Sequence, residues 1–154
     1  MTPIRRTARA AALTLVVLAW SIPAVPGGND TPVGTWNTYD DKKGDLRSVV
    51  RIDVVGQELT ATIVKAVLRP GEPEHPTCEK CPGEFKDKPI EGLTFMWGLT
   101  GGGREWSGGQ VLDPEEGKIY RVKLKLSPDG RTLEVRGFVG VSLFGRTQRW
   151  TRAD

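Results

Sequence analysis

Histidine and cysteine are scarce in this chain of 154 residues, which has one histidine and two cysteines. The histidine, His75, has no serine or acidic residue placed by the sequence to act with it, so no catalytic set is identified. A zinc site needs about four ligands, and the chain offers His75, Cys78 and Cys81 unless Glu79 or Glu84 completes the set. We therefore predict a non-enzymatic protein with no catalytic residues, no cofactor and no assigned metal.

Long hydrophobic runs are also missing, apart from residues 10–20, a run too short for a comfortable membrane span. Three arginines precede this run, and Ala24 follows it as a small residue suited to cleavage. This order of segments is typical of a secretory signal peptide. We predict a signal peptide over residues 1–24, with a retained anchor as the alternative. Lipoprotein anchoring is disfavoured because no cysteine lies at the boundary.

The rest of the chain is long enough for one self-sufficient core. Residues 25–32 are rich in Pro, Gly, Asn and Asp, and we predict a flexible leader there. We predict a single domain over residues 33–154, in the periplasm or secreted.

An excess of charge of one sign is absent once the signal peptide is set aside. The whole chain has 22 Lys and Arg against 19 Asp and Glu. Arg5, Arg6 and Arg9 lie in the signal segment, which has no acid, so the 22 basic residues less these three balance the 19 acidic ones. Binding to nucleic acid or to an anionic membrane depends on excess positive charge. We predict no nucleic-acid partner and no stable membrane anchor after cleavage.

The cysteine pair leaves three interpretations open. An even number of cysteines in an exported chain favours a disulfide, here between Cys78 and Cys81. A redox dithiol usually lies at a helix start, which Pro82 and Gly83 do not indicate. Haem attachment needs a histidine directly after the second cysteine, where Pro82 stands. We predict a structural disulfide, with a metal site or a redox site as the alternatives.

Alternation of apolar and polar residues predicts strands along most of the chain. The clearest case is residues 119–139, where apolar side chains alternate with arginine and lysine around a Ser-Pro-Asp-Gly turn. Pro128 presets its own φ and Gly130 tolerates a positive φ, so the chain reverses there. We predict strands over residues 34–39, 48–55, 58–65, 93–99, 105–112, the two arms of the 119–139 hairpin, and 146–152.

Two segments lack this alternation. Residues 69–92 contain five prolines and both cysteines, and proline removes the donors that a strand needs, so we predict a long loop. Residues 140–145 have no clear period, and we predict a single helical turn there.

Eight short strands at meander spacing and no long helix predict an all-β fold, either a barrel or a sandwich. Closure removes exposed edges, so we predict an eight-stranded antiparallel up-and-down barrel with one long loop that carries prolines and both cysteines. Closure would place the first strand beside the last, with Trp36 near Trp150 and Arg152. We predict that the Arg152 guanidinium covers the Trp36 indole and plugs one end of the barrel.

Four segments together resemble a known family: Gly34-Thr35-Trp36, residues 78–83, residues 106–114 and residues 145–152. Over about Pro32 to Arg152 the chain resembles the exported bacterial family catalogued only as domain of unknown function 2147 (DUF2147). Its members look like small lipocalin-like barrels with signal peptides, so the resemblance implies that fold and a bacterial periplasm, without an established activity. The Gly-x-Trp opening with a late arginine is also similar to the lipocalin signature, whereas the long proline-rich loop with its cysteine pair departs from it.

A barrel of eight strands has room for side chains or for one small ligand. We predict that this chain binds a small hydrophobic or amphipathic molecule. The candidate cavity residues are Trp36, Phe95, Trp97, Trp106, Tyr120 and Arg152. One alternative is a filled barrel that acts as an envelope interaction or maintenance module through residues 69–92. The other is thiol or metal chemistry at the cysteine pair.

Overall fold

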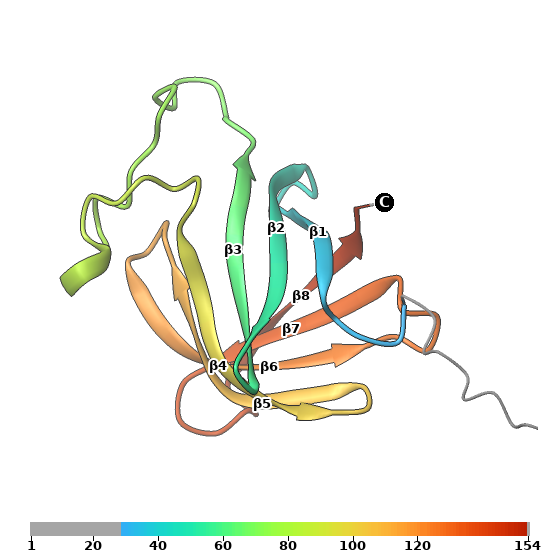
Figure 1. Cartoon of the computed structure of the whole chain (residues 1–154). Coiled ribbons are helices and arrows are strands. Elements are labelled where there is room, and N and C mark those ends of the chain that lie inside the picture. The colour runs from blue at the N-terminus through green and yellow to red at the C-terminus, as the bar shows by residue number, and fades with distance from the viewer. Residues whose placement is uncertain (1–28, 154) are drawn as a thin grey trace, which may run out of the picture.

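The computed structural model describes residues 29–153, so the predicted signal peptide and residues 25–28 of the predicted leader lie outside the described residues. Eight antiparallel strands follow one another around a closed barrel (Figure 1). The strands are β1 (Gly34–Tyr39), β2 (Leu46–Val55), β3 (Glu58–Ala66), β4 (Thr94–Gly102), β5 (Glu105–Asp113), β6 (Lys118–Leu126), β7 (Thr132–Phe138) and β8 (Gly145–Arg152). The predicted all-β up-and-down barrel is confirmed, and a sandwich is excluded.

The last strand pairs with the first and closes the barrel. Trp36 lies opposite Arg152 in the antiparallel ladder between β1 and β8. The Arg152 guanidinium carbon lies 4.4 Å from the centroid of the Trp36 ring, and Trp36 is fully buried. A cation over an indole face is attracted by the ring quadrupole, so this pair seals one end of the barrel, as predicted.

Residues 29–32 lie against this closed end, although the sequence predicts a flexible leader there. The Pro32 carbonyl accepts a hydrogen bond from the Trp36 indole N–H at 2.8 Å. The Thr31 carbonyl accepts one from Arg152 at 2.8 Å, and Asp30 forms an ion pair with Arg104 at 3.0 Å. The composition of this segment indicates the absence of a strand, whereas two of these three contacts are made by the remote side chains Arg104 and Arg152.

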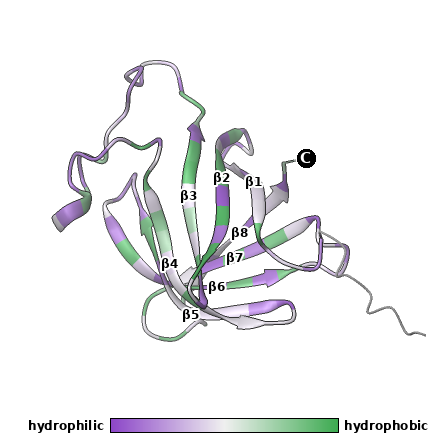
Figure 2. Ribbon diagram, viewed as in Figure 1, coloured by the Kyte–Doolittle hydropathy of each residue, from purple (hydrophilic) through white to green (hydrophobic). Residues whose placement is uncertain are grey.

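Alternation along each strand decides which side chains fill the barrel (Figure 2). On β6, Val122, Leu124 and Leu126 are buried, while the basic residues between them are exposed. Irregular pairing interrupts this order between β3 and β4, where the register shifts twice between Leu59 and Thr62. Such shifts change which face a side chain occupies, because the period of a strand is two.

The connection between β3 and β4 is the long loop that the sequence predicts. It contains the three-residue 3-10 helix η1 (Gly83–Phe85) and a single bridge between Thr77 and Pro89. Around this bridge the Cys78 amide donates to the Lys88 carbonyl at 2.8 Å and the Ile90 amide donates to the Pro76 carbonyl at 2.9 Å, so the two halves of the loop are joined to each other.

The predicted helical turn over residues 140–145 is wrong. Residues 139–144 form a turn between β7 and β8, closed by hydrogen bonds between Val139 and Phe144 and between Phe144 and Val141. Two antiparallel strands set the ends of this segment a short distance apart, so it turns back at once. Among residues 29–153, no helix is long and apolar enough to cross a membrane.

Candidate functional site

The end of the barrel opposite the Trp36–Arg152 plug holds a cavity of about 1020 Å³. Its mouth is formed by the four connections at that end, over residues 40–45, 67–93, 114–117 and 139–144. A volume of this size matches the upper range of small-molecule sites. The barrel is therefore closed at one end and open at the other.

The floor of the cavity is apolar. It is lined by the buried side chains Ile63, Phe95, Leu112, Val135 and Trp150. Phe95 and Trp150 face each other with ring centroids 6.1 Å apart and planes tilted by 45°, which is a favourable aromatic geometry. A molecule that enters the mouth meets a hydrophobic surface with two aromatic rings at its base.

Two pairs of polar groups interrupt the apolar wall, and the members of each pair are hydrogen-bonded to each other. The hydroxyls of Thr38 and Ser48 lie 2.7 Å apart. The Trp150 indole N–H donates to the Gln148 side-chain oxygen at 3.2 Å. A few polar groups in an apolar cavity fix the orientation of a ligand, so the wall suits a molecule that is mostly hydrophobic with some hydrogen-bonding atoms.

Glycine gives the cavity part of its space. Gly137 lines the cavity on β7, and a Cβ added there would lie 3.8 Å from the nearest atoms, on Tyr120 and Val111. That distance is ordinary contact, so a larger side chain at this position would extend into the cavity without strain at its base.

Tyr120 lies on the wall near the mouth, half-buried, and its hydroxyl donates to Glu116 at 2.6 Å. This hydrogen bond to the carboxylate, helped by burial, raises the pKa of Tyr120 to about 12. The same bond is the main cause of a lowered pKa at Glu116. At neutral pH the pair is thus a phenol and a carboxylate, which holds the β5–β6 turn against the wall.

Ion pairs join three of the four rim connections. Arg47 on β2 binds Glu72 at 3.0 Å and Glu115 at 2.9 Å. Arg69 binds Glu115 at 3.2 Å and also forms a short ion pair with Asp40. The 40–45, 67–93 and 114–117 connections are therefore tied to one another by charge.

These contacts set the charge state of the acids. Partial burial alone would raise the pKa of Glu72, but hydrogen bonds from the Arg69 amide and the Arg47 side chain outweigh it, and the pKa lies below its ordinary value. The pKa of Asp40 is also lowered, first by hydrogen bonds from the Lys43 and Lys42 amides. Asp40 and Glu72 therefore stay ionised at neutral pH.

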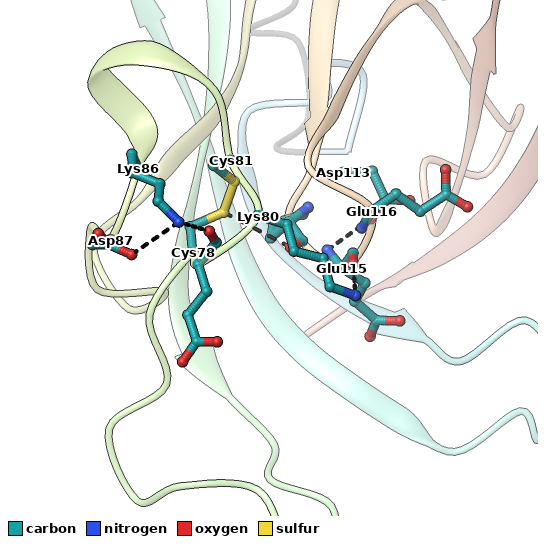
Figure 3. The surroundings of a disulfide bond; sticks show 10 residues. Cys78, Lys80, Cys81, Lys86, Asp87, Asp113, Glu115 and Glu116 are labelled. Atoms are coloured by element: carbon teal, nitrogen blue, oxygen red, sulfur yellow. Dashed lines mark hydrogen bonds and ion pairs between the residues drawn. A yellow bond between two sulfur atoms is a disulfide. The ribbon is translucent and has the colours of Figure 1, made fainter.

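The cysteine pair forms a disulfide within the long loop (Figure 3). Cys78 and Cys81 are both buried, and between them the Lys80 side chain donates to the Glu115 carbonyl at 3.1 Å. A Cβ added to Gly117 would lie 2.0 Å from the Lys80 carbonyl oxygen, so only glycine permits this close approach of the β5–β6 turn. The disulfide therefore holds the loop against the rim of the cavity.

No three His, Cys, Asp or Glu side chains within residues 29–153 are grouped so as to hold a metal ion. The two sulfurs that a metal site would use are joined to each other, and His75 is exposed. The lining of the cavity contains neither histidine nor cysteine. The ionisable side chains of the lining are carboxylates, lysines, arginines and tyrosines, which gather at the mouth.

The structure separates the six predicted cavity residues into three groups. Phe95 and Tyr120 line the cavity. Trp36 and Arg152 form the plug at the far end, and Trp106 is buried at that end on β5, opposite Leu124. The sequence pattern predicts which side chains point into the barrel but not how far along the barrel axis each one lies. The prediction that Trp36, Trp106 and Arg152 line the cavity was wrong for this reason.

Trp97 lies outside the cavity, although the sequence places it on the same face as Phe95. Its ring stacks on Phe85 of the long loop with centroids 5.4 Å apart, and its indole N–H donates to Gln110 at 3.2 Å. The register shifts between β3 and β4 break the alternation, so Phe95 and Trp97 face different surroundings.

Several lining residues were missed as site candidates. Ile63, Val135 and Gln148 lie near those strand ends that meet at the open end. The sequence does contain a signal that could have identified them. Each lies close to one of the connections at the end of the barrel opposite Trp36.

A closed antiparallel up-and-down barrel of eight strands with one plugged end and one open cavity is a lipocalin-like fold. The chain belongs to the bacterial family described as "Uncharacterized protein conserved in bacteria (DUF2147)", whose model matches residues 34–152. Among solved structures, protein HP1028 from the human pathogen Helicobacter pylori, described as belonging to the lipocalin family, is similar in fold with a TM-score of 0.70. The two share 20% sequence identity, over 80% of this chain and 84% of that one. The chain has no significant match among curated proteins.

Proposed function

We propose that this protein is a non-enzymatic carrier that binds one small amphipathic molecule in the open cavity. The observation that carries the proposal is the cavity of about 1020 Å³, with an apolar floor and a charged rim. An apolar part of the ligand would contact Phe95 and Trp150, and a polar part would face the ion pairs of the mouth. Affinity would come mainly from apolar area removed from water.

Exported location is part of the same proposal, in the periplasm or outside the cell. It is supported by the signal-like segment 1–24 and by the disulfide, because disulfides persist in oxidising compartments. Fractionation of cells and the mass of the processed chain test it. A cytoplasmic protein that keeps residues 1–24 would contradict it.

Ligand binding is tested by tryptophan fluorescence titrated with fatty acids, sterol-like molecules and tetrapyrroles. Trp150 lies at the cavity floor, so a bound ligand changes its emission, and a Trp150→Phe variant removes that change. The Gly137→Leu variant places a side chain in the cavity and takes up part of its volume, so we expect it to weaken binding by about tenfold or more, which corresponds to about 1.4 kcal/mol.

Gly102→Leu is the matched control, because an added Cβ there has no atom within 4 Å and the residue lies at the β4–β5 turn, away from the cavity. Unchanged affinity in Gly137→Leu, or the absence of any response in the wild-type protein, would refute the carrier function.

The two other predicted functions remain hypotheses that this experiment separates from the first. An interaction module acting through residues 69–92 would capture its partner equally well in the wild type and in Gly137→Leu. Thiol chemistry would require both Cys78 and Cys81, whereas a carrier keeps its ligand affinity when both are replaced by serine.

A further inference from the structure

The turn between β7 and β8 presents an unusual apolar surface. Val139, Val141, Leu143 and Phe144 are 66%, 61%, 78% and 71% exposed. Large apolar side chains scattered singly over a surface are ordinary, but four within six residues of one turn form a continuous apolar tip. We call these four residues the β7–β8 tip.

Positive charge surrounds the base of this tip. Arg121 donates to the Gly140 carbonyl at 3.3 Å, and the Lys123 ammonium contacts the Ser142 hydroxyl at 3.3 Å. Arg136 donates to the Ser142 carbonyl at 2.7 Å and to the Leu143 carbonyl at 3.1 Å. None of these three cations forms an ion pair with a carboxylate of residues 29–153.

The acidic residues on this side of the mouth do not cancel that charge. Asp41 and Asp113 share Arg146, at 2.9 and 3.5 Å, so this group leaves one negative charge against the three cations at the base of the tip. The balance of charges over the whole chain therefore hides a local excess, which lies directly beside the apolar tip.

The tip lies at the mouth of the cavity. Val139 and Phe144 both line the cavity at its edge, together with Phe138 at the end of β7. In Figure 1 the β7–β8 connection is the loop at the lower left, on the side of the barrel away from the C-terminus. A surface that covers the tip would therefore also face the cavity opening.

We propose that the β7–β8 tip docks this protein on an anionic lipid bilayer. The four apolar side chains enter the interface between headgroups and acyl chains, and Arg121, Lys123 and Arg136 contact the phosphates. A membrane surface has negatively charged headgroups on the outside and hydrocarbon beneath them. An apolar tip with cations at its base matches this order, because the tip reaches the hydrocarbon while the cations stay at the headgroups. Docking brings the cavity mouth to the membrane, where an amphipathic molecule could pass between them. The proposal does not depend on the cavity being occupied.

Flotation of the protein with lipid vesicles tests it, with phosphatidylcholine and phosphatidylglycerol together compared with phosphatidylcholine alone. Each variant is made in the full chain as the cell processes it, so the segment before residue 29 contributes equally. The wild type binds the anionic vesicles and is released by high salt, because salt screens charge at the surface. It binds neutral vesicles much more weakly.

Two double variants separate the parts of the surface. Leu143→Ser with Phe144→Ser lowers the affinity for anionic vesicles by roughly a hundredfold, because two apolar side chains are lost. Arg121→Gln with Lys123→Gln lowers it by about twentyfold or more, since each cation near the membrane contributes about fivefold.

Matched controls lie at the closed end. Val54 and Val55 are 55% and 63% exposed, so Val54→Ser with Val55→Ser also removes two exposed apolar side chains, at the other end of the barrel. Arg51→Gln with Arg131→Gln removes the same charge as the second variant. Both controls bind like the wild type. Equal losses in controls and tip variants, or no preference for anionic vesicles, would overturn the proposal. Loss of self-association in the tip variant by analytical ultracentrifugation, without vesicle binding, would assign the tip to a second copy instead.

Discussion

Removal of the Arg152 side chain tests the barrel closure most directly. The guanidinium covers Trp36 at 4.4 Å and donates to the carbonyls of Gly130 at 2.9 Å, Val33 at 3.1 Å and Thr31 at 2.8 Å. Stacking on an indole contributes about 1 kcal/mol for a half-buried pair. Each of the two partly buried hydrogen bonds contributes about 1 kcal/mol, and the exposed one contributes little. We expect Arg152→Ala to lower the free energy of unfolding by about 3 kcal/mol.

Urea unfolding followed by circular dichroism measures this loss. Arg152→Lys keeps the charge near the ring but offers one nitrogen instead of three, so it recovers only part of the stability. Arg149→Ala is the control on the same strand, because Arg149 is 74% exposed and pairs only with Glu134 at 3.3 Å. Such a surface pair contributes less than about 1 kcal/mol. Equal effects of Arg152→Ala and Arg149→Ala would refute the plug.

Three other predictions concern the open end. Spectrophotometric titration should show the Tyr120 phenol with a pKa of about 12, and Glu116→Gln should move it down toward the ordinary value of 10.0, because the carboxylate causes the shift; an unchanged titration would contradict the hydrogen bond. The pKa of Glu72 is lowered by folding, so its ionised form stabilises the protein above pH 4.5, and this contribution is lost as the pH falls through the pKa of the folded state. Glu72→Gln should therefore flatten this part of the plot of stability against pH. A steeper plot would contradict the prediction. Replacement of Cys78 and Cys81 by serine should lower the free energy of unfolding by no more than about 2 kcal/mol, because the loop that the disulfide closes is short. Denaturant midpoints under oxidising conditions measure this loss. A much larger loss would mean that the disulfide organises the barrel itself.

The fold was predictable because its signal is local and repeated. Each strand needs only its own alternation and a turn at each end, as Pro128 and Gly130 illustrate. The Trp36–Arg152 contact was predictable for a different reason: once an up-and-down sheet closes, its first and last strands must pair. The turn at residues 139–144 was harder, since a short segment without a period fits a helical turn and a tight connection equally well.

The candidate site was only partly predictable. Phe95 and Tyr120 line the cavity, whereas Trp97 stacks on Phe85 outside the barrel. The difference arises in the register between β3 and β4, and a shift in pairing is a property of two strands. The sequence of either strand alone therefore does not predict the shift in register.

The sequence by itself determined the number and order of the strands, because the alternation of apolar and polar residues is a local property of each segment. It favoured a closed barrel over a sandwich and a disulfide over a metal or redox site, without deciding either. Only the tertiary structure decided which end of the barrel is hollow and where charge gathers. Packing fills one end with Trp36 and leaves space beside Gly137, and three cations on neighbouring strands meet one apolar turn. Such features depend on distances between residues remote in the chain, which composition and period do not encode.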